Sequence, residues 1–271
     1  MKLAKFIPIV VIFLNHIAHG QTPGGGVTDV DGNTYQSVII GTQEWMSENL
    51  KTSKYSNGNN IFNETDQTTW LNLTSGAWVY YNNDSQFDIP FGKLYNWHAV
   101  SDTRNICPNG WHVPSDLEWM TLVNYLGGEN VAGTKMKSVG TQFWQSPNTG
   151  TNESGFTGLP GGNRSGSFLS EGLWGYWWSS TEFNSGGAWL YSLNYNFPQA
   201  IRNNPGKVFG YSVRCINDIP LEIIELKNGQ KSISQIVDLM GRQTECKMNT
   251  PLIYIYNDGS REKVFVVQEN E

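Results

Sequence analysis

Hydrophobic and polar positions along the chain follow a helical spacing in one clear place. Residues 115–126 carry apolar side chains three and four positions apart, and Glu118 stands three positions after Ser115. Serine followed by glutamate at this spacing is typical of a capping box. The pattern therefore predicts a helix that begins at Ser115 and ends at the glycine pair after Leu126. A second, shorter helix is predicted over 131–139.

Strand patterns dominate the second half of the chain. Three runs of β-branched and aromatic residues predict strands, at 175–180, 188–194 and 210–216. Alternation within the first run predicts that one of Trp177 and Trp178 faces the core. Near the N-terminus, 27–40 contains Asp-Gly between two alternating runs, which predicts a hairpin. Polar stretches at 51–92 and 141–173 are predicted to be loops. The predicted fold class is α+β, with helices early and a small antiparallel sheet late.

The chain divides into four predicted segments: a signal peptide at 1–20, a flexible spacer at 21–26, a globular module at 27–218 and a β-rich unit at 219–271. The first segment has two lysines, an apolar run and then small residues before Gln21, where cleavage is expected. Ile219-Pro220 marks the last boundary. No later stretch approaches the roughly 20 apolar residues of a membrane helix. We therefore expect an exported protein, at the outer cell surface or outside the cell, without a membrane span.

Composition and charge narrow the range of partners. Charged residues make up 15% of the chain and aromatic residues 13%, with 29 glycines and 11 tryptophans, so rings and neutral polar groups replace ion pairs. Loss of the two lysines of the signal peptide takes the formal net charge from −6 to −8. An acidic protein without a basic run is not expected to bind nucleic acid or an anionic membrane surface.

Three cysteines, Cys107, Cys215 and Cys246, suit an oxidising compartment, in which two of them are expected to pair. Cys107 precedes a proline at a turn and Cys215 ends a strand-like run, so we predict a disulfide between these two. Cys246 is expected to stay free. The disulfide would close a loop of about a hundred residues, which is worth about 4 kcal/mol on a chain-entropy estimate.

Six motifs, in order along the module, resemble a known family. They are DGNTYQSVIIGTQEWMSENLK (31–51), FGKLYNWHAV (91–100), CPNGWHVPSDLEW (107–119), ESGFTGLPGGNRS (153–165), GYWWSSTE (175–182) and GYSVRCIND (210–218). Together they resemble the Fibrobacter succinogenes major paralogous domain. This resemblance implies a distant likeness to C-type lectin-like and formylglycine-generating-enzyme folds, with a small twisted sheet, two helices and long loops.

The C-terminal unit resembles a second family. Its segments IVDLMGR (236–242) and NTPLIYIYNDGSREKVFVV (249–267) are similar to a short form of the type IX secretion sorting domain found in Bacteroidetes. The resemblance implies that the secretion machinery is a partner of the tail. A plain β appendage that packs on the module is the alternative.

Catalytic motifs are missing from the sequence of the predicted mature chain. His98 and His112 lie in separate motifs, no Gly-x-Ser-x-Gly elbow accompanies them, and zinc-ligand spacing is lacking. The close cysteine pair of formylglycine-generating enzymes is also lacking. Calcium stays open as a cofactor, with scattered candidate ligands: Asp84, Asp88, Glu153 and Glu182. Paired carboxylates for glycoside hydrolysis are recognisable only in three dimensions. We therefore expect that the protein is not an enzyme, and we assign no catalytic or metal-binding residues.

Aromatic and amide side chains crowd the segment 174–211. Rings supply stacking area at a small entropic cost and amides hydrogen-bond in both directions, a combination typical of ligand-binding loops. The candidate ligand-binding residues are Trp174, Tyr176, Trp189, Tyr191, Asn194, Tyr195, Asn196, Arg202, Asn203 and Asn204. The leading hypothesis is a non-catalytic module that binds a glycan or a protein at the bacterial surface. The alternative is a structural or assembly protein whose rings are core.

Overall fold

The computed structural model describes residues 21–218, 233–244, 251–256 and 259–265. The predicted signal peptide, the boundary at Ile219-Pro220 and Cys246 lie outside these residues. Within the described ranges, no helix has the length and apolar character that crossing a membrane requires.

The fold is mostly β, with 36% strand and 17% helical residues, so the predicted α+β class is wrong. The strands form several small sheets, and the helices between them are short. Nothing in this arrangement supports the lectin-like fold that the resemblance implied. The prediction failed because polar stretches at 51–92 and 141–173 also form short strands. These strands are only two to four residues long, which is too short for a clear alternation of apolar and polar residues.

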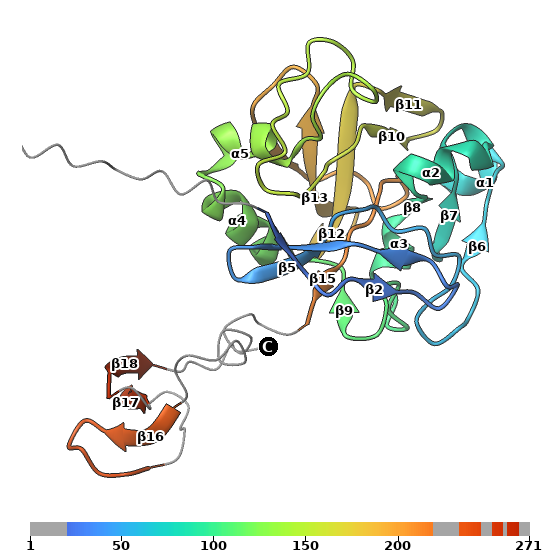
Figure 1. Ribbon diagram of the computed structural model, residues 1–271. Coiled ribbons are helices and arrows are strands. Elements are labelled where there is room, and N and C mark those ends of the chain that lie inside the picture. The colour runs from blue at the N-terminus through green and yellow to red at the C-terminus, as the bar shows by residue number, and fades with distance from the viewer. Residues whose placement is uncertain (1–20, 219–232, 245–250, 257–258, 266–271) are drawn as a thin grey trace, which may run out of the picture.

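The largest sheet joins the two ends of the module (Figure 1). Its five strands follow in the order β1 (Thr22–Pro23), β4 (Ser37–Ile40), β5 (Gln43–Met46), β15 (Ile216–Asn217) and β9 (Trp111–His112). Thr22 lies opposite Ile39, so part of the predicted flexible spacer is an edge strand. Ile216 pairs with both Trp45 and His112, which fixes the C-terminal end of the module between β5 and β9.

A three-stranded antiparallel sheet runs through the middle of the module. Its strands are β12 (Trp174–Asn184), β13 (Gly187–Asn194) and β14 (Ala200–Asn203). The strands predicted at 175–180 and 188–194 are confirmed, and β14 lies where only an Asn-rich connection was expected. The third predicted strand, 210–216, enters a named strand only at Ile216. Before it, Gly210, Tyr211 and Ser212 make isolated bridges to Arg164, Tyr95 and Trp177.

The remaining strands form four small sheets. They are β2 (Val27–Thr28) with β3 (Thr34–Tyr35); β6 (Phe62–Asn63), β7 (Ala77–Val79) and β8 (Leu94–Tyr95); β10 (Gly161–Arg164) with β11 (Phe168–Glu171); and β16 (Ile233–Asp238), β17 (Pro251–Tyr256) and β18 (Arg261–Phe265). The first is the hairpin predicted around Asp31-Gly32. The last, in the C-terminal part of the chain, is antiparallel throughout.

Both predicted helices are present, as α4 (Asp116–Tyr125) and α5 (Glu129–Met136). Ser115 and Glu118 form the predicted capping box at the start of α4. Gly133 lets α5 approach β14 closely, because a Cβ there would stand 2.1 Å from the carbonyl oxygen of Gln199. The other helices are one or two turns long: α1 (Gln67–Leu71), η1 (Tyr81–Asn83), η2 (Ser85–Phe87), α2 (Asp88–Phe91) and α3 (Trp97–Val100).

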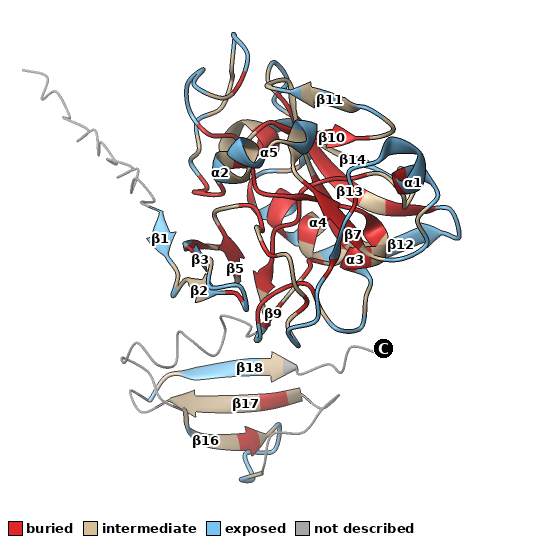
Figure 2. Cartoon of the chain, turned by 90° about the vertical axis from the view of Figure 1, so that its right-hand side faces the viewer, coloured by how far each residue is buried: buried red, intermediate tan, exposed pale blue. Residues whose placement is uncertain are grey.

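The core is unusually aromatic, and it covers both faces of the β12–β13 hairpin. Figure 2 shows β13 buried along almost its whole length. Trp177 belongs to a cluster with Trp119, whereas Trp178 belongs to a second cluster with Trp97. Both neighbours are fully buried, so the prediction that only one of them faces the core is wrong. Alternation places them on opposite faces, but here each face has its own core.

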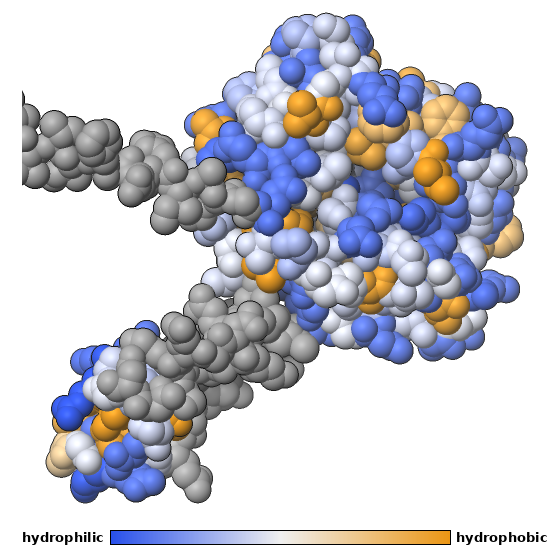
Figure 3. Space-filling model, viewed as in Figure 1, coloured by the Kyte–Doolittle hydropathy of each residue, from blue (hydrophilic) through white to orange (hydrophobic). Residues whose placement is uncertain are grey.

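The predicted disulfide between Cys107 and Cys215 is confirmed. Both cysteines are fully buried, with their Cα atoms 6.0 Å apart. The bond joins the segment before β9 to the segment before β15, so it closes a loop that contains most of the module. On the face of the molecule that Figure 3 shows, apolar side chains form several small groups rather than one large patch.

Candidate functional site

Strand alternation divides the predicted site residues between two faces of the sheet β12–β14. Opposite residues share a face in an antiparallel pair, and Tyr176 lies opposite Ser192 whereas Trp177 lies opposite Tyr191. Across the next pair, Tyr191 lies opposite Arg202. One face therefore carries Trp174, Tyr176, Asn194 and Asn203. The other, which we call the helix-covered face, carries Trp189, Tyr191 and Arg202.

An open depression of about 440 Å³ lies over the first face, and we call it the aromatic hollow. Four residues of the predicted set line it: Trp174, Tyr176, Asn203 and Asn204. Four others complete it, and the sequence pattern does not single them out: Leu190, Ser192, Pro205 and Tyr211. Its volume lies in the range of roughly 300–1,000 Å³ that is usual for small-molecule sites.

The rings of the aromatic hollow continue into the core. The rings of Trp174 and Tyr176 are nearly parallel, with centroids 5.7 Å apart. Tyr176 in turn contacts Tyr211 at 5.2 Å, and Tyr211 meets the buried Trp178 edge-on at 4.8 Å. Burial raises the pKa of both tyrosines, so their hydroxyl groups stay neutral. Half-exposed rings that are braced by buried rings have little rotamer freedom left to lose when a ligand binds.

Amide and hydroxyl groups form the polar part of the lining of the aromatic hollow, which we call its polar wall. The side-chain amide of Asn203 donates a hydrogen bond of 3.2 Å to the Ser192 hydroxyl, which donates to the carbonyl of Ile201. The carbonyl oxygen of the Asn203 side chain is left to accept. Within the described residues, the side chain of the exposed Asn204 has no hydrogen-bond partner. The polar wall therefore offers both donors and acceptors to a ligand.

Residues on the helix-covered face hold α4 against the sheet. The guanidinium of Arg202 lies 3.4 Å from the ring centroid of Trp189 and donates to both carboxylate oxygens of Asp116. The ring of Tyr191 stacks on Trp119 at 5.0 Å, and its hydroxyl donates to the same carboxylate. Burial, together with Asp116, raises the pKa of Tyr191. These three predicted site residues therefore pack away from the aromatic hollow.

Three predicted residues remain: Asn194 ends β13, and Tyr195 and Asn196 form the turn after it. Asn194 is buried, and its carbonyl accepts a hydrogen bond of 2.7 Å from the ammonium group of Lys137. Tyr195 packs against the core cluster of the helix-covered face, while Asn196 is exposed. Neither of these two residues lines the aromatic hollow.

A comparison with protein-family models matches the Fibrobacter succinogenes major domain over residues 38–217. The chain belongs to the Fibrobacter succinogenes major domain family. The matched region runs from β4 to β15 and contains both disulfide cysteines and every residue of the aromatic hollow. Neither the curated proteins nor the solved structures compared with the chain include a match.

The four acidic residues considered as calcium ligands each interact with a different partner. Within the part of the chain that the structure describes, no three His, Cys, Asp or Glu side chains gather as a metal site would need. Among the residues considered for calcium, Asp84 caps the turn η2 and Asp88 pairs with Lys93 at 3.1 Å. Glu153 and Glu182 face Lys135 and Lys207 at 4.0 and 3.1 Å.

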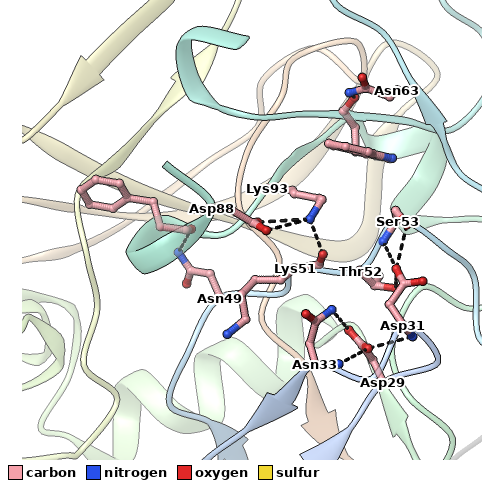
Figure 4. A network of polar contacts seen from close by, with 12 residues as sticks. Asp29, Asp31, Asn33, Asn49, Lys51, Thr52, Ser53, Asn63, Asp88 and Lys93 are labelled. Carbon is pink, nitrogen blue, oxygen red and sulfur yellow. Dashed lines mark hydrogen bonds and ion pairs between the residues drawn. The ribbon is translucent and has the colours of Figure 1, made fainter. Parts of the chain in front are cut away.

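A polar network supports the N-terminal motif of the major domain (Figure 4). The Asp29 carboxylate accepts hydrogen bonds from the backbone of Asp31 and from Asn33. Asp31 accepts two from Ser53; burial opposes ionisation of Asp31, but these bonds outweigh it and lower its pKa to about 2. Nearby, the buried Lys93 ammonium donates to Asp88 and lies over aromatic rings. These side chains satisfy one another, so the network is structural.

His112 lies between two carboxylates at the end of the major domain. Its Nδ1 is 2.5 Å from Asp218 and its Nε2 is 2.8 Å from Glu118, the residue of the capping box. Burial alone would lower the pKa of His112, but the two carboxylates outweigh it and raise the pKa to about 8. The other histidine, His98, lies on α3, and burial lowers its pKa.

We expect the stability of the protein to fall between pH 6 and pH 9 because of His112. Its pKa of about 8 in the folded state exceeds the unfolded value of about 6.5. Its contribution is therefore complete below pH 6.5 and disappears as the pH rises through 8. Since the ring is partly exposed, we expect only about 1 kcal/mol. Urea unfolding at several pH values measures this loss of stability, and the variant His112→Gln should no longer show the loss. The same pH profile in both proteins would contradict the assignment.

Proposed function

We propose that this family member is an exported, non-catalytic binding protein whose aromatic hollow recognises a glycan or a protein at the bacterial surface. The observation that carries the proposal is the aromatic hollow itself. Neutral rings and amides face an open depression, and the rings are braced by the core. This is the arrangement of a preformed ligand site, in which few groups must be ordered on binding.

The chemistry of the aromatic hollow supports binding rather than catalysis. Acid–base or nucleophilic catalysis needs a carboxylate, histidine, cysteine or activated hydroxyl within reach of the substrate. The described lining residues include no carboxylate, imidazole or thiol, and the Ser192 hydroxyl bonds to a backbone carbonyl rather than to a base.

Export and surface location are part of the same proposal. A buried disulfide in the described module suits an oxidising compartment outside the cytoplasm. The basic, apolar and small residues before Gln21 occur in the order of a signal peptide. We also propose that the tail is a type IX secretion sorting unit, supported by its sequence resemblance and by the antiparallel sheet of β16, β17 and β18.

Trp174→Ala is expected to weaken ligand binding at least tenfold, because truncating a stacked ring at the centre of a site costs more than about 1 kcal/mol. The matched control is Trp189→Ala, which removes the same side chain from the helix-covered face and should leave the affinity unchanged. Both variants are titrated against a panel of bacterial polysaccharides and surface proteins. Equal losses in both variants, or none in Trp174→Ala, would contradict the proposed site.

A further inference from the structure

We infer that the aromatic hollow binds a segment of an uncharged polysaccharide. This inference rests on the proposed function, and it selects one class of ligand from those that the function allows. Three features of the described residues support it: the electrical neutrality of the lining, the two-way hydrogen bonding of the polar wall, and the position of the hollow on a sheet face rather than at a sheet edge.

Cations near the aromatic hollow are turned away from it and already paired. Arg202 stands next to Asn203 in β14, but alternation sends its side chain to the opposite face, where it pairs with Asp116 at 2.5 Å. Lys207 follows the lining residue Pro205 by two positions, yet its ammonium group faces Glu182 at 3.1 Å and the ring of Trp97 at 4.7 Å. A ligand carboxylate or phosphate would thus lose water without gaining a countercharge, at a large cost in free energy.

The hydrogen-bonding groups of the polar wall match sugar hydroxyls. A sugar hydroxyl donates one hydrogen bond and accepts others, so it needs neighbours of both kinds. Asn204 offers an amide with both, and Asn203 keeps a carbonyl oxygen beside its bond to Ser192. Trp174 and Tyr176, which line the same hollow, offer apolar ring surface to the C–H groups of a pyranose.

The position of the aromatic hollow favours a sugar over an extended peptide. Peptides that add to a sheet bind at an edge strand, where backbone N–H and C=O groups are unpaired. The hollow instead lies over one face of a paired sheet, for example over Tyr176, Ser192 and Asn203, where Ser192 stands on the central strand β13 between the outer strands β12 and β14. Its contacts must come from side chains, and these are rings, amides and a hydroxyl.

The test titrates the full chain with two sets of polymers: neutral glucans, mannans and galactans, and acidic polyuronates. We expect saturable binding of a neutral polymer, with an affinity that stays constant between low and high salt because no ion pair forms. Trp174→Ala and Asn204→Ala should each weaken this binding about tenfold. Trp189→Ala should not, and the melting temperature of each variant reports whether it folds.

Two outcomes of these titrations would overturn the inference. Binding of a polyuronate, or of a protein, that is lost in Asn204→Ala would overturn the ligand class and leave the proposed function standing. Binding of any polymer that neither Trp174→Ala nor Asn204→Ala weakens would place the site elsewhere and overturn both. Because the side chain of Asn204 is exposed and has no hydrogen-bond partner among the residues that the structure describes, its variant tests the inference even if Trp174→Ala fails to fold.

Discussion

Replacing Cys107 and Cys215 together with alanine is expected to lower the free energy of unfolding by about 4 kcal/mol. The disulfide joins residues 108 positions apart, and opening so long a loop returns a large conformational entropy to the unfolded chain. The same loop contains β12, β13 and β14, so the aromatic hollow depends on this closure. Urea unfolding measures the loss from the shift in midpoint.

The double variant has a matched control in Cys246→Ala, which removes a cysteine predicted to be free. This variant should leave the stability within about 0.5 kcal/mol of the parent. The double variant should also unfold with a steeper dependence on urea, because an unfolded chain without the cross-link exposes more surface. A loss below about 1 kcal/mol would show that the disulfide hardly constrains the unfolded state.

Lys137→Met is expected to destabilise the protein by about 3 kcal/mol. The buried ammonium of Lys137 donates to the Thr149 hydroxyl and to the carbonyls of Asn194, Tyr195 and Phe197, at 2.6 to 3.3 Å. Methionine keeps the apolar stem but removes this donor. The carbonyl of Tyr195 still accepts from the backbone N–H of Thr149, whereas the carbonyl of Phe197 loses the ammonium, and an unsatisfied buried group costs about 1–3 kcal/mol. Burial lowers the pKa of Lys137 to about 8, so the group is still mostly charged at pH 7.

The control for this variant lies two residues earlier, in the last turn of α5. Lys135 is partly exposed and its nearest carboxylate, on Glu153, is 4.0 Å away, so Lys135→Met should change the stability by less than about 0.5 kcal/mol. Urea unfolding of both variants measures the difference. Similar losses from Lys135→Met and Lys137→Met would show that the four oxygen contacts contribute little to stability.

Local features of the structure could be predicted from the sequence. The helix α4 carries its own start signal in Ser115 and Glu118, and the hairpin of β2 and β3 carries its Asp-Gly turn. The disulfide followed from counting three cysteines and pairing the two inside the module. In each case the deciding atoms lie within a few residues of one another, or the choice of partners is small.

The fold class was missed because several strands are short and lie in polar stretches. β10 and β11 form a hairpin of two four-residue strands, and β14 follows β13 after an Asn-rich connection, so local alternation gave little signal for them. The site prediction named residues of one sheet and of the turn beside it, and four of them line the aromatic hollow. It took residues from both faces of the sheet, because aromatic content alone does not tell an exposed ring from a buried one.

The sequence by itself determined the family, the capped helix, the disulfide and the strands β12 and β13, because each has a signal within a short window or a specific motif. Only the tertiary structure decided which rings face the aromatic hollow. Trp174 and Trp189 look alike in sequence, but β12 and β13 are packed on both faces, and α4 covers one of these. Strand alternation fixes the face on which a side chain lies. Burial of that face depends on residues that are remote in sequence, such as Asp116 and Tyr211.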